Sequence, residues 1–295
     1  MTVRDLGYRA YDGVRLPASR NTYVLLGHAM RRAWGSWLVK IAVFLGWIPL
    51  VVYLIKVMFV YWLMSKLEGG RPPPGEAADA LGILTDPGES IRNLFNYQVW
   101  AFVTLITLGA GSGTIAEDFT HKAFQFYFAK PVTATQYLLA RTGATAIFSF
   151  MLTFIPALIL VLGIVVAADP SLRLQHFGLV LPALFYSLLI SSVLSVMAVA
   201  TSSISKSRAL TMSAWIVLLI VPQSIASLVS AIGNVSWFYL ASPPALLGLV
   251  GDALFKTVDT EHLVRWYHAA PLLIALTAGS IWLANRRVRN AEVIT

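Results

Sequence analysis

Long uninterrupted apolar runs constrain this chain more than any other feature. A hydrocarbon core of roughly 30 Å requires about 20 apolar residues in helical conformation. Only 12% of the 295 residues are charged, whereas soluble domains carry about 25%. Six runs of suitable length are separated by charged residues, Gly or Pro, at about 37–64, 97–113, 137–168, 177–202, 209–232 and 268–284. We therefore predict an all-α membrane protein with six transmembrane helices in one membrane domain, 1–295.

The distribution of Lys and Arg predicts the orientation of these spans. With the N-terminus inside, 15 of the 22 basic residues fall in cytoplasmic segments, six in external segments, and Lys56 within the first span. Excess positive charge marks the cytoplasmic side of a membrane. The net charge of +8 thus indicates orientation and not nucleic-acid binding, because it flanks the apolar runs. We predict that both termini are cytoplasmic, including a C-terminal tail at 285–295.

Two shorter segments are predicted to lie at the membrane surface. Residues 1–36 lack the order of a signal peptide and are predicted to form a cytoplasmic tail and an interfacial helix. Apolar residues fall on one side of that helix, at Tyr23, Leu26, Met30, Ala33 or Trp34, and Trp37. The residues His28, Arg31 and Arg32 lie elsewhere, toward anionic lipid. A plain membrane anchor is the alternative. The apolar run 245–255 is too short to cross, so we expect a re-entrant or interfacial helix at the outer face.

The connection between the second and third spans carries the most specific pattern. Thr114 followed by Glu117 fits a capping box at the start of a helix. Polar residues then recur on one side, at Asp118, His121, Lys122 and Gln125, and mostly aromatic residues on another, at Phe119, Ala123, Phe126 and Tyr127, until Pro131. The pattern predicts one short amphipathic helix over 114–131 at the cytoplasmic surface. It could be a simple connector anchored by its aromatic residues, or a docking surface for a cytoplasmic partner.

Three motifs around this helix resemble the signature region of ABC-type-2 exporter permeases. They are Ile115-Ala116-Glu117-Asp118, then Phe128-Ala129-Lys130-Pro131-Val132, then Tyr137-Leu138-Leu139-Ala140-Arg141. The resemblance extends to the six-span layout and to the short helices before the first and sixth spans. It implies a transport subunit in a bacterial-type inner membrane, paired with a second permease chain as a homodimer or related heterodimer, and bound to two copies of an ABC ATP-binding subunit.

The resemblance also implies a role for residues 116–128, which would be the coupling helix that sits in a cleft of the ATPase. The expected contact residues are Glu117, Asp118, His121, Lys122 and Gln125. No GxxxxGK[ST] phosphate loop occurs in the chain. We therefore expect no enzymatic activity and no cofactor in this chain, with ATP and Mg²⁺ bound by the partner ATPase.

Other functions of a six-span membrane protein leave their own marks in a sequence. Gly109-Ala110-Gly111-Ser112-Gly113 superficially resembles the serine loop of an intramembrane protease, but Gly111 and Gly113 more simply mark a helix end. The chain has no cysteine and no HExxH motif, so a thiolate site is excluded and no zinc site is predicted. A secondary transporter would normally carry buried acidic groups in its spans, and an assembly subunit is not excluded by sequence. Lys56 is expected to extend toward the external headgroups, although a role facing substrate or a second chain stays open.

Overall fold

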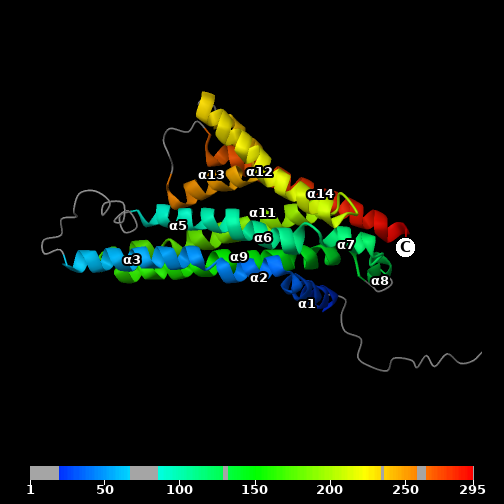
Figure 1. Cartoon of the computed structure of the whole chain (residues 1–295), viewed down its shortest axis with the longest axis horizontal. Coiled ribbons are helices and arrows are strands. Elements are labelled where there is room, and N and C mark those ends of the chain that lie inside the picture. The colour runs from blue at the N-terminus through cyan, green and yellow to red at the C-terminus, as the bar shows by residue number, and fades with distance from the viewer. Residues whose placement is uncertain (1–19, 67–85, 129–131, 234–235, 258–263, 295) are drawn as a thin grey trace, which may run out of the picture.

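The computed structural model describes residues 20–66, 86–128, 132–233, 236–257 and 264–294, which form an elongated bundle of helices (Figure 1). Within these ranges the chain contains helices and no strand, which confirms the all-α prediction. The α-helices are α1 (Arg20–Gly35), α2 (Trp37–Leu45), α3 (Ile48–Lys66), α5 (Pro87–Tyr97), α6 (Thr104–Ile106), α7 (Thr114–Thr120), α8 (Phe124–Phe128), α9 (Ala134–Ala167), α10 (Arg173–Phe177), α11 (Val180–Ser202), α12 (Arg208–Gly233), α13 (Pro243–Phe255) and α14 (Trp266–Ile294). Two π-helical segments, Gln98–Val103 and Thr107–Gly111, and a 3₁₀ segment, Ser236–Ala241, complete the described elements.

Six continuous helical stretches in the described residues are long and apolar enough to cross a membrane. They are Trp37–Leu63, Pro87–Thr120, Ala134–Ala167, Arg173–Ser202, Arg208–Gly233 and Trp266–Asn290. Their number and order match the six apolar runs of the sequence. The chain is therefore built as a multi-pass membrane protein, while the side of the membrane on which its termini lie stays a prediction.

The second span begins ten residues before the expected position. The Asp86 side chain accepts a hydrogen bond from the Glu89 amide at 3.1 Å, and Pro87 occupies the first helical position. Both features favour a helix start. Residues 87–96 were predicted to lie in an external loop because charged residues lie among them. In the structure, however, Ile91, Leu94 and Phe95 are fully buried. One apolar face of α5 thus packs into the bundle, although the helix as a whole is polar in composition.

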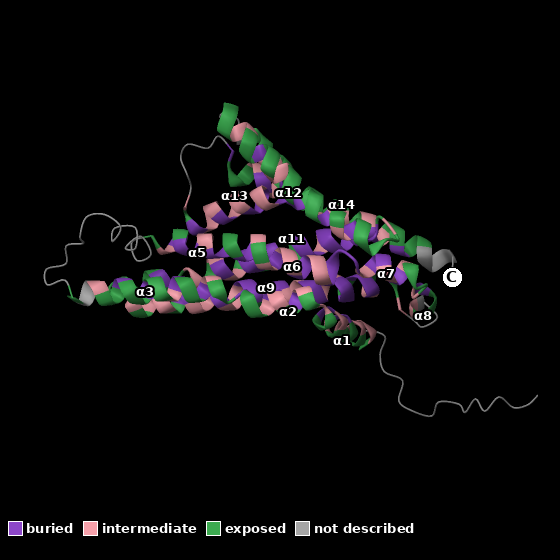
Figure 2. Cartoon of the chain, viewed as in Figure 1, coloured by how far each residue is buried: buried purple, intermediate pink, exposed green. Residues whose placement is uncertain are grey.

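The third and fourth spans, α9 and α11, form the centre of the bundle. Figure 2 shows buried residues concentrated on these helices and on the neighbouring second span. Leu160 and Ile164 of α9 and Ile190 and Leu194 of α11 belong to the same buried cluster. Helix α1 lies along α9, and Leu26 approaches Gly143 there. By contrast, α12 is mostly exposed, as expected of a helix that faces lipid or a second chain.

Helix α13 fills the space between α5 and the pair α12 and α14 (Figure 1). Ser242 caps its start, with the Oγ accepting a hydrogen bond from the Ala245 amide, and Pro243 follows as the first residue. It ends at Lys256, whose φ of 59° is left-handed. Its 13 residues make it a short apolar helix between two membrane-length helices. Whether it is re-entrant or interfacial stays a prediction.

Candidate functional site

The predicted amphipathic helix, 114–131, is two short helices at a bend over residues 114–128, and residues 129–131 lie outside the described ranges. We call residues 114–128, comprising α7, a turn at 121–123 and α8, the elbow. Lys122 in the turn has a φ of 52°, and the Ala123 amide donates to the Asp118 carbonyl at 2.9 Å. The bend brings Phe124 into the core, where its ring lies 4.7 Å from that of Phe119 and 5.3 Å from that of Tyr137. The prediction of one continuous helix was therefore wrong, because burial of Phe124 requires the break.

The predicted capping box at Thr114 and Glu117 is also absent. The Thr114 hydroxyl donates to the Gly111 carbonyl, and Glu117 is drawn into ion pairs. The first amides of α7, those of Ile115 and Ala116, instead donate to the Ser202 Oγ at 2.8 and 3.1 Å. The cap of α7 thus comes from the end of α11. A capping box does occur at the start of α9, where Thr133 and Gln136 bond reciprocally.

Asp118 is the centre of a buried group of charges. Its Oδ1 accepts a hydrogen bond from Arg32 at 2.7 Å, and its Oδ2 accepts bonds from Arg141 and from the Tyr137 hydroxyl, each at 2.5 Å. The side chains of Asp118 and Arg141 are each only 4% exposed. Charge-assisted hydrogen bonds of this kind are among the strongest in proteins. Asp118 is therefore fully engaged inside the protein, and its predicted contact with an ATPase does not fit this position.

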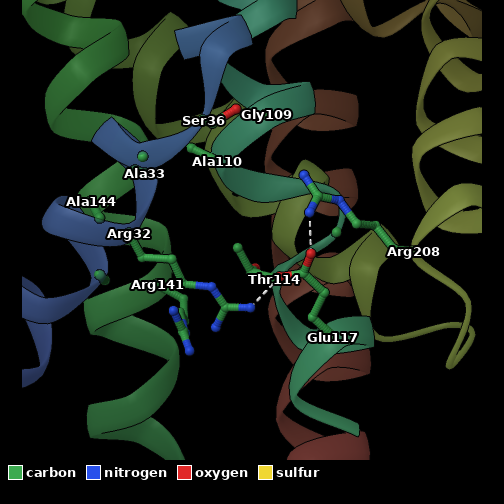
Figure 3. A pocket seen from close by; sticks show the side chains of 13 residues that line it. Arg32, Ala33, Ser36, Gly109, Ala110, Thr114, Glu117, Arg141, Ala144 and Arg208 are labelled. Atoms are coloured by element: carbon green, nitrogen blue, oxygen red, sulfur yellow. Dashed lines mark hydrogen bonds and ion pairs between the residues drawn. The ribbon is translucent and has the colours of Figure 1, made fainter. Parts of the chain in front are cut away.

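Glu117 forms the second, more exposed half of the same group. Its carboxylate pairs with Arg32 from α1 and with Arg208 from the start of α12 (Figure 3). We call Glu117, Asp118, Arg32, Arg141 and Arg208 the ion-pair cluster. It carries one net positive charge, and it connects α7 to α1, α9 and α12. Any movement of the elbow is therefore linked to the ends of three other helices.

Arg32 departs from its predicted orientation toward lipid. It points into the protein, and Ala29 and Ala33 form the buried side of α1. Burial alone would lower the pKa of Arg32, but its hydrogen bond to Asp118 and the charge of that carboxylate outweigh this effect and raise the pKa. The guanidinium therefore stays charged at any physiological pH. Arg31 and His28, in contrast, are exposed as expected.

A cavity of about 270 Å³ lies beside the cluster. Figure 3 shows the side chains that line it, from α1, the second span, α9 and α12. Much of the lining is small because larger residues would not fit. A Cβ on Gly109 would lie 2.7 Å from the Ser36 Oγ, and one on Gly113 would lie 2.8 Å from the Arg208 Cγ. Gly113, which was interpreted as part of a helix end, thus allows close approach of Arg208, and Gly109 allows close approach of Ser36, between α1 and α2.

The remaining predicted contact residues lie on the surface of the elbow. His121, Lys122 and Gln125 are exposed. The Phe126 side chain is 76% exposed, which fits both alternatives, an anchor in the membrane interface and a contact with a partner. We call these four residues the elbow tip. Of the five predicted contact residues, the structure thus places three in the exposed elbow tip. The other two, Glu117 and Asp118, belong to the ion-pair cluster.

Sequence reasoning missed the arginine partners of the two carboxylates. Arg208 was counted only as a charge that sets orientation, Arg32 was expected to face anionic lipid, and Tyr137 and Arg141 were named as the ends of a motif. One signal was present, because Glu117 and Asp118 are the only acidic residues between Glu89 and Asp169. Two isolated carboxylates among several arginines at one membrane surface favour ion pairs.

Lys56 lies on the exposed side of α3, and its Nζ is 5.2 Å from the centroid of the Tyr53 ring. It does not face the core of this chain, which fits either extension toward headgroups or a contact with a second chain. Within the described residues, no three His, Asp or Glu side chains lie close enough to share a metal ion.

No protein-family model matches the sequence, and no curated protein matches it. The motif resemblance and the geometry of the elbow are therefore the features of this chain that bear on its function.

Proposed function

We propose that this chain is the membrane-spanning permease subunit of an ATP-driven exporter of the ABC-type-2 kind. Two such chains, or this chain and a related one, would bind two separate ATP-binding subunits that hold ATP and Mg²⁺. The observation that carries the proposal is the elbow. An exposed tip of His121, Lys122, Gln125 and Phe126 projects from a buried support of ion pairs. A loose connector would not need such a support.

The elbow is bonded to the ends of several helices, as expected of a segment that transmits movement to the membrane domain. The ion-pair cluster ties α7 to α1, α9 and α12, and the Ser202 cap ties it to α11. The Thr120 hydroxyl also donates to the Lys206 carbonyl at 2.6 Å, in the connection between α11 and α12. Closure of an ATPase around the tip would displace these helix ends together. Such a displacement can shift the membrane domain between two states that differ in affinity for ATP-bound partners.

The proposal is tested by purifying the tagged chain in mild detergent, identifying the proteins that accompany it, and measuring ATP hydrolysis. We expect a stoichiometric nucleotide-binding subunit and ATPase activity. Replacing Gln125 and Phe126 together by Ala should weaken binding of that subunit roughly thirtyfold, because an interface hot spot contributes about 2 kcal/mol or more.

Leu174→Ala is the matched control, since Leu174 is 85% exposed in α10. It lies at the opposite end of the bundle and should leave the complex intact. A chain that purifies alone and without ATPase activity would instead favour a secondary transporter or an assembly subunit.

A further inference from the structure

A second cavity, of about 180 Å³, lies at the end of the bundle opposite the elbow. It is lined by α5 and the following π-helical segment, by α12, by the 3₁₀ segment and by α13. The lining residues used below are Arg92, Asn96, Trp100, Gln223, Gly248 and Asp252. π-helical segments are rare and are often found at functional sites, and Trp100 projects from one. This cavity shares no residue with the ion-pair cluster.

A charged pair is fixed in the wall of this cavity. The Arg92 Nε donates to the Asp252 Oδ1 at 2.7 Å, and the guanidinium lies 5.8 Å from the centroid of the Tyr186 ring. Glycines of α13 make room for it, because a Cβ on Gly248 would lie 3.0 Å from the Arg92 Nη2 and one on Gly251 would lie 2.9 Å from its Nε. The Arg92 side chain is 15% exposed and that of Asp252 is 36% exposed. The two opposite charges are thus held rigidly and remain accessible from the cavity.

The cavity also offers hydrogen-bond donors in excess. Within the described residues, Arg92 bonds to protein only through Nε, so its Nη1 and Nη2 groups can donate to a ligand. The Gln223 Oε1 accepts a bond from the Ser242 hydroxyl at 2.7 Å, which leaves the amide N–H groups of Gln223 as donors. Asn96 and the Trp100 indole add further donors. A ligand rich in acceptor oxygens is therefore favoured.

The polar groups of the cavity follow an order along the membrane-spanning helices, from charged to neutral. Arg92 and Trp100 are eight residues apart on one helix, which corresponds to roughly 12 Å along its axis. The charges lie near the helix end, and the neutral donors lie deeper in the span. One turn deeper than Gln223, Ile220 of α12 is exposed and apolar. This order matches a phospholipid, with a charged headgroup, then ester carbonyl groups, then acyl chains.

We propose that this cavity binds a zwitterionic headgroup that carries a phosphate and a primary amine. The phosphate would accept hydrogen bonds from the Nη groups of Arg92 and from Asn96, and the ammonium group would lie against Asp252. A zwitterion matches the neutral Arg92–Asp252 pair, whereas a purely anionic group would leave uncompensated charge beside it. The cavity is smaller than the pockets of roughly 300–1,000 Å³ that enclose whole drug-sized ligands. It therefore holds the headgroup while the acyl chains lie outside. This site is independent of the proposed coupling to an ATPase.

Two sources share this chemistry, phosphatidylethanolamine and soluble phosphoethanolamine, and the experiment distinguishes them. The full-length chain is reconstituted in nanodiscs with equal parts of phosphatidylethanolamine, phosphatidylglycerol and phosphatidylcholine. After mild extraction, the retained lipids are counted by native mass spectrometry. We expect selective retention of phosphatidylethanolamine, reduced roughly tenfold in Arg92→Gln, because hydrogen bonds to a charged group contribute about 1.5–3 kcal/mol.

Two further variants guard against simple misfolding. Arg92→Gln with Asp252→Asn removes both charges without leaving one of them unpaired, and Asn96→Ala changes an exposed residue. The double variant should lose selectivity for phosphatidylethanolamine, because the carboxylate that faces the ammonium group is gone. Asn96→Ala should weaken retention of all three lipids, because each of them carries the phosphate that Asn96 contacts. Both variants should keep a native elution profile. Arg265→Gln is the matched control, because Arg265 is exposed beside the start of α14 and does not line the cavity.

Equal retention of the three lipids by the unmodified chain would overturn the proposal, as would unchanged selectivity in the natively eluting double variant. A second arm adds phosphoethanolamine to the lipid-depleted protein and follows thermal unfolding. A rise in unfolding temperature that depends on Arg92, without selective lipid retention, would assign the same site to the soluble compound and refute the lipid as its source.

Discussion

At the residue scale, two adjacent carboxylates have different environments and therefore different expected roles. Asp118 is buried against Arg141 and accepts three hydrogen bonds, from Arg32, Arg141 and Tyr137. Glu117 is 20% exposed, and its partner Arg208 is 48% exposed. Removing one partner of a buried ion pair leaves an uncompensated charge, whereas a surface pair contributes little. Charge reversal at both residues would therefore disturb folding at Asp118, and it is a poor test of coupling.

Asp118→Asn should lower the free energy of unfolding by about 3–5 kcal/mol, because Arg141 would then lie buried without a counter-ion. Glu117→Gln is the matched comparison and should cost about 1 kcal/mol, since its partners are more exposed. Unfolding of both variants in detergent micelles, followed by circular dichroism, measures the difference. Equal losses of stability in the two variants would show that Asp118 is not the centre of the cluster.

At the element scale, the elbow depends on a remote residue for its start. The Ser202 hydroxyl, at the end of α11, accepts both the Ile115 and the Ala116 amides. Without this oxygen the first turn of α7 would have two buried donors with no partner. The position of the elbow is therefore set by the packing of α7 against α11 and not by its own sequence.

Ser202→Ala should destabilise the protein by about 1–2 kcal/mol, the usual cost of losing a helix cap. Ser192→Ala, on the same helix, is the control, because its exposed hydroxyl donates only to carbonyls of its own helix. That change should stay within about 0.5 kcal/mol. Thermal unfolding in detergent compares the two, and a Ser202→Ala variant as stable as the control would contradict the capping role.

The six spans could be predicted because length and hydropathy alone determine them. The start of α5 could not, since its polar sequence hides the buried face formed by Ile91, Leu94 and Phe95. The break at Lys122 was missed because it depends on the burial of Phe124 against residues of α9. The partners of Asp118 lie as many as 86 positions away in the sequence. Local periodicity contains no information about such contacts, so the pattern identified the elbow but not its buried support.

At the scale of the whole molecule, the bundle has two ends with different chemistry. The ends of α1, α7 and α14 lie together, and Val288 of α14 packs in the same cluster as Ile115 and Phe124. Helices α5 and α13, which carry Arg92 and Asp252 of the second cavity, lie away from that end of the bundle (Figure 1). A chain with six spans must place these two ends on opposite sides of a membrane.

The native chain has no cysteine, so single cysteines can report this arrangement directly. In oriented membrane vesicles, a membrane-impermeant maleimide should label Gln125→Cys and Arg289→Cys from one side and Lys256→Cys from the other. We expect the first two positions to be cytoplasmic, as the distribution of basic residues predicts. Labelling of Lys256→Cys from the same side as Gln125→Cys would rule out the six-span topology.

The most direct test of the central claim is site-specific crosslinking from the elbow tip in intact membranes. A photoreactive amino acid replaces Phe126, which is 76% exposed, and in the control it replaces Leu174 at the other end of the bundle. The account predicts a crosslink from position 126 to a nucleotide-binding protein, with a yield that changes when ATP is trapped, and none from position 174. A position 126 that captures only lipid, or the same proteins as position 174, would contradict the proposal that this elbow couples the chain to an ATPase.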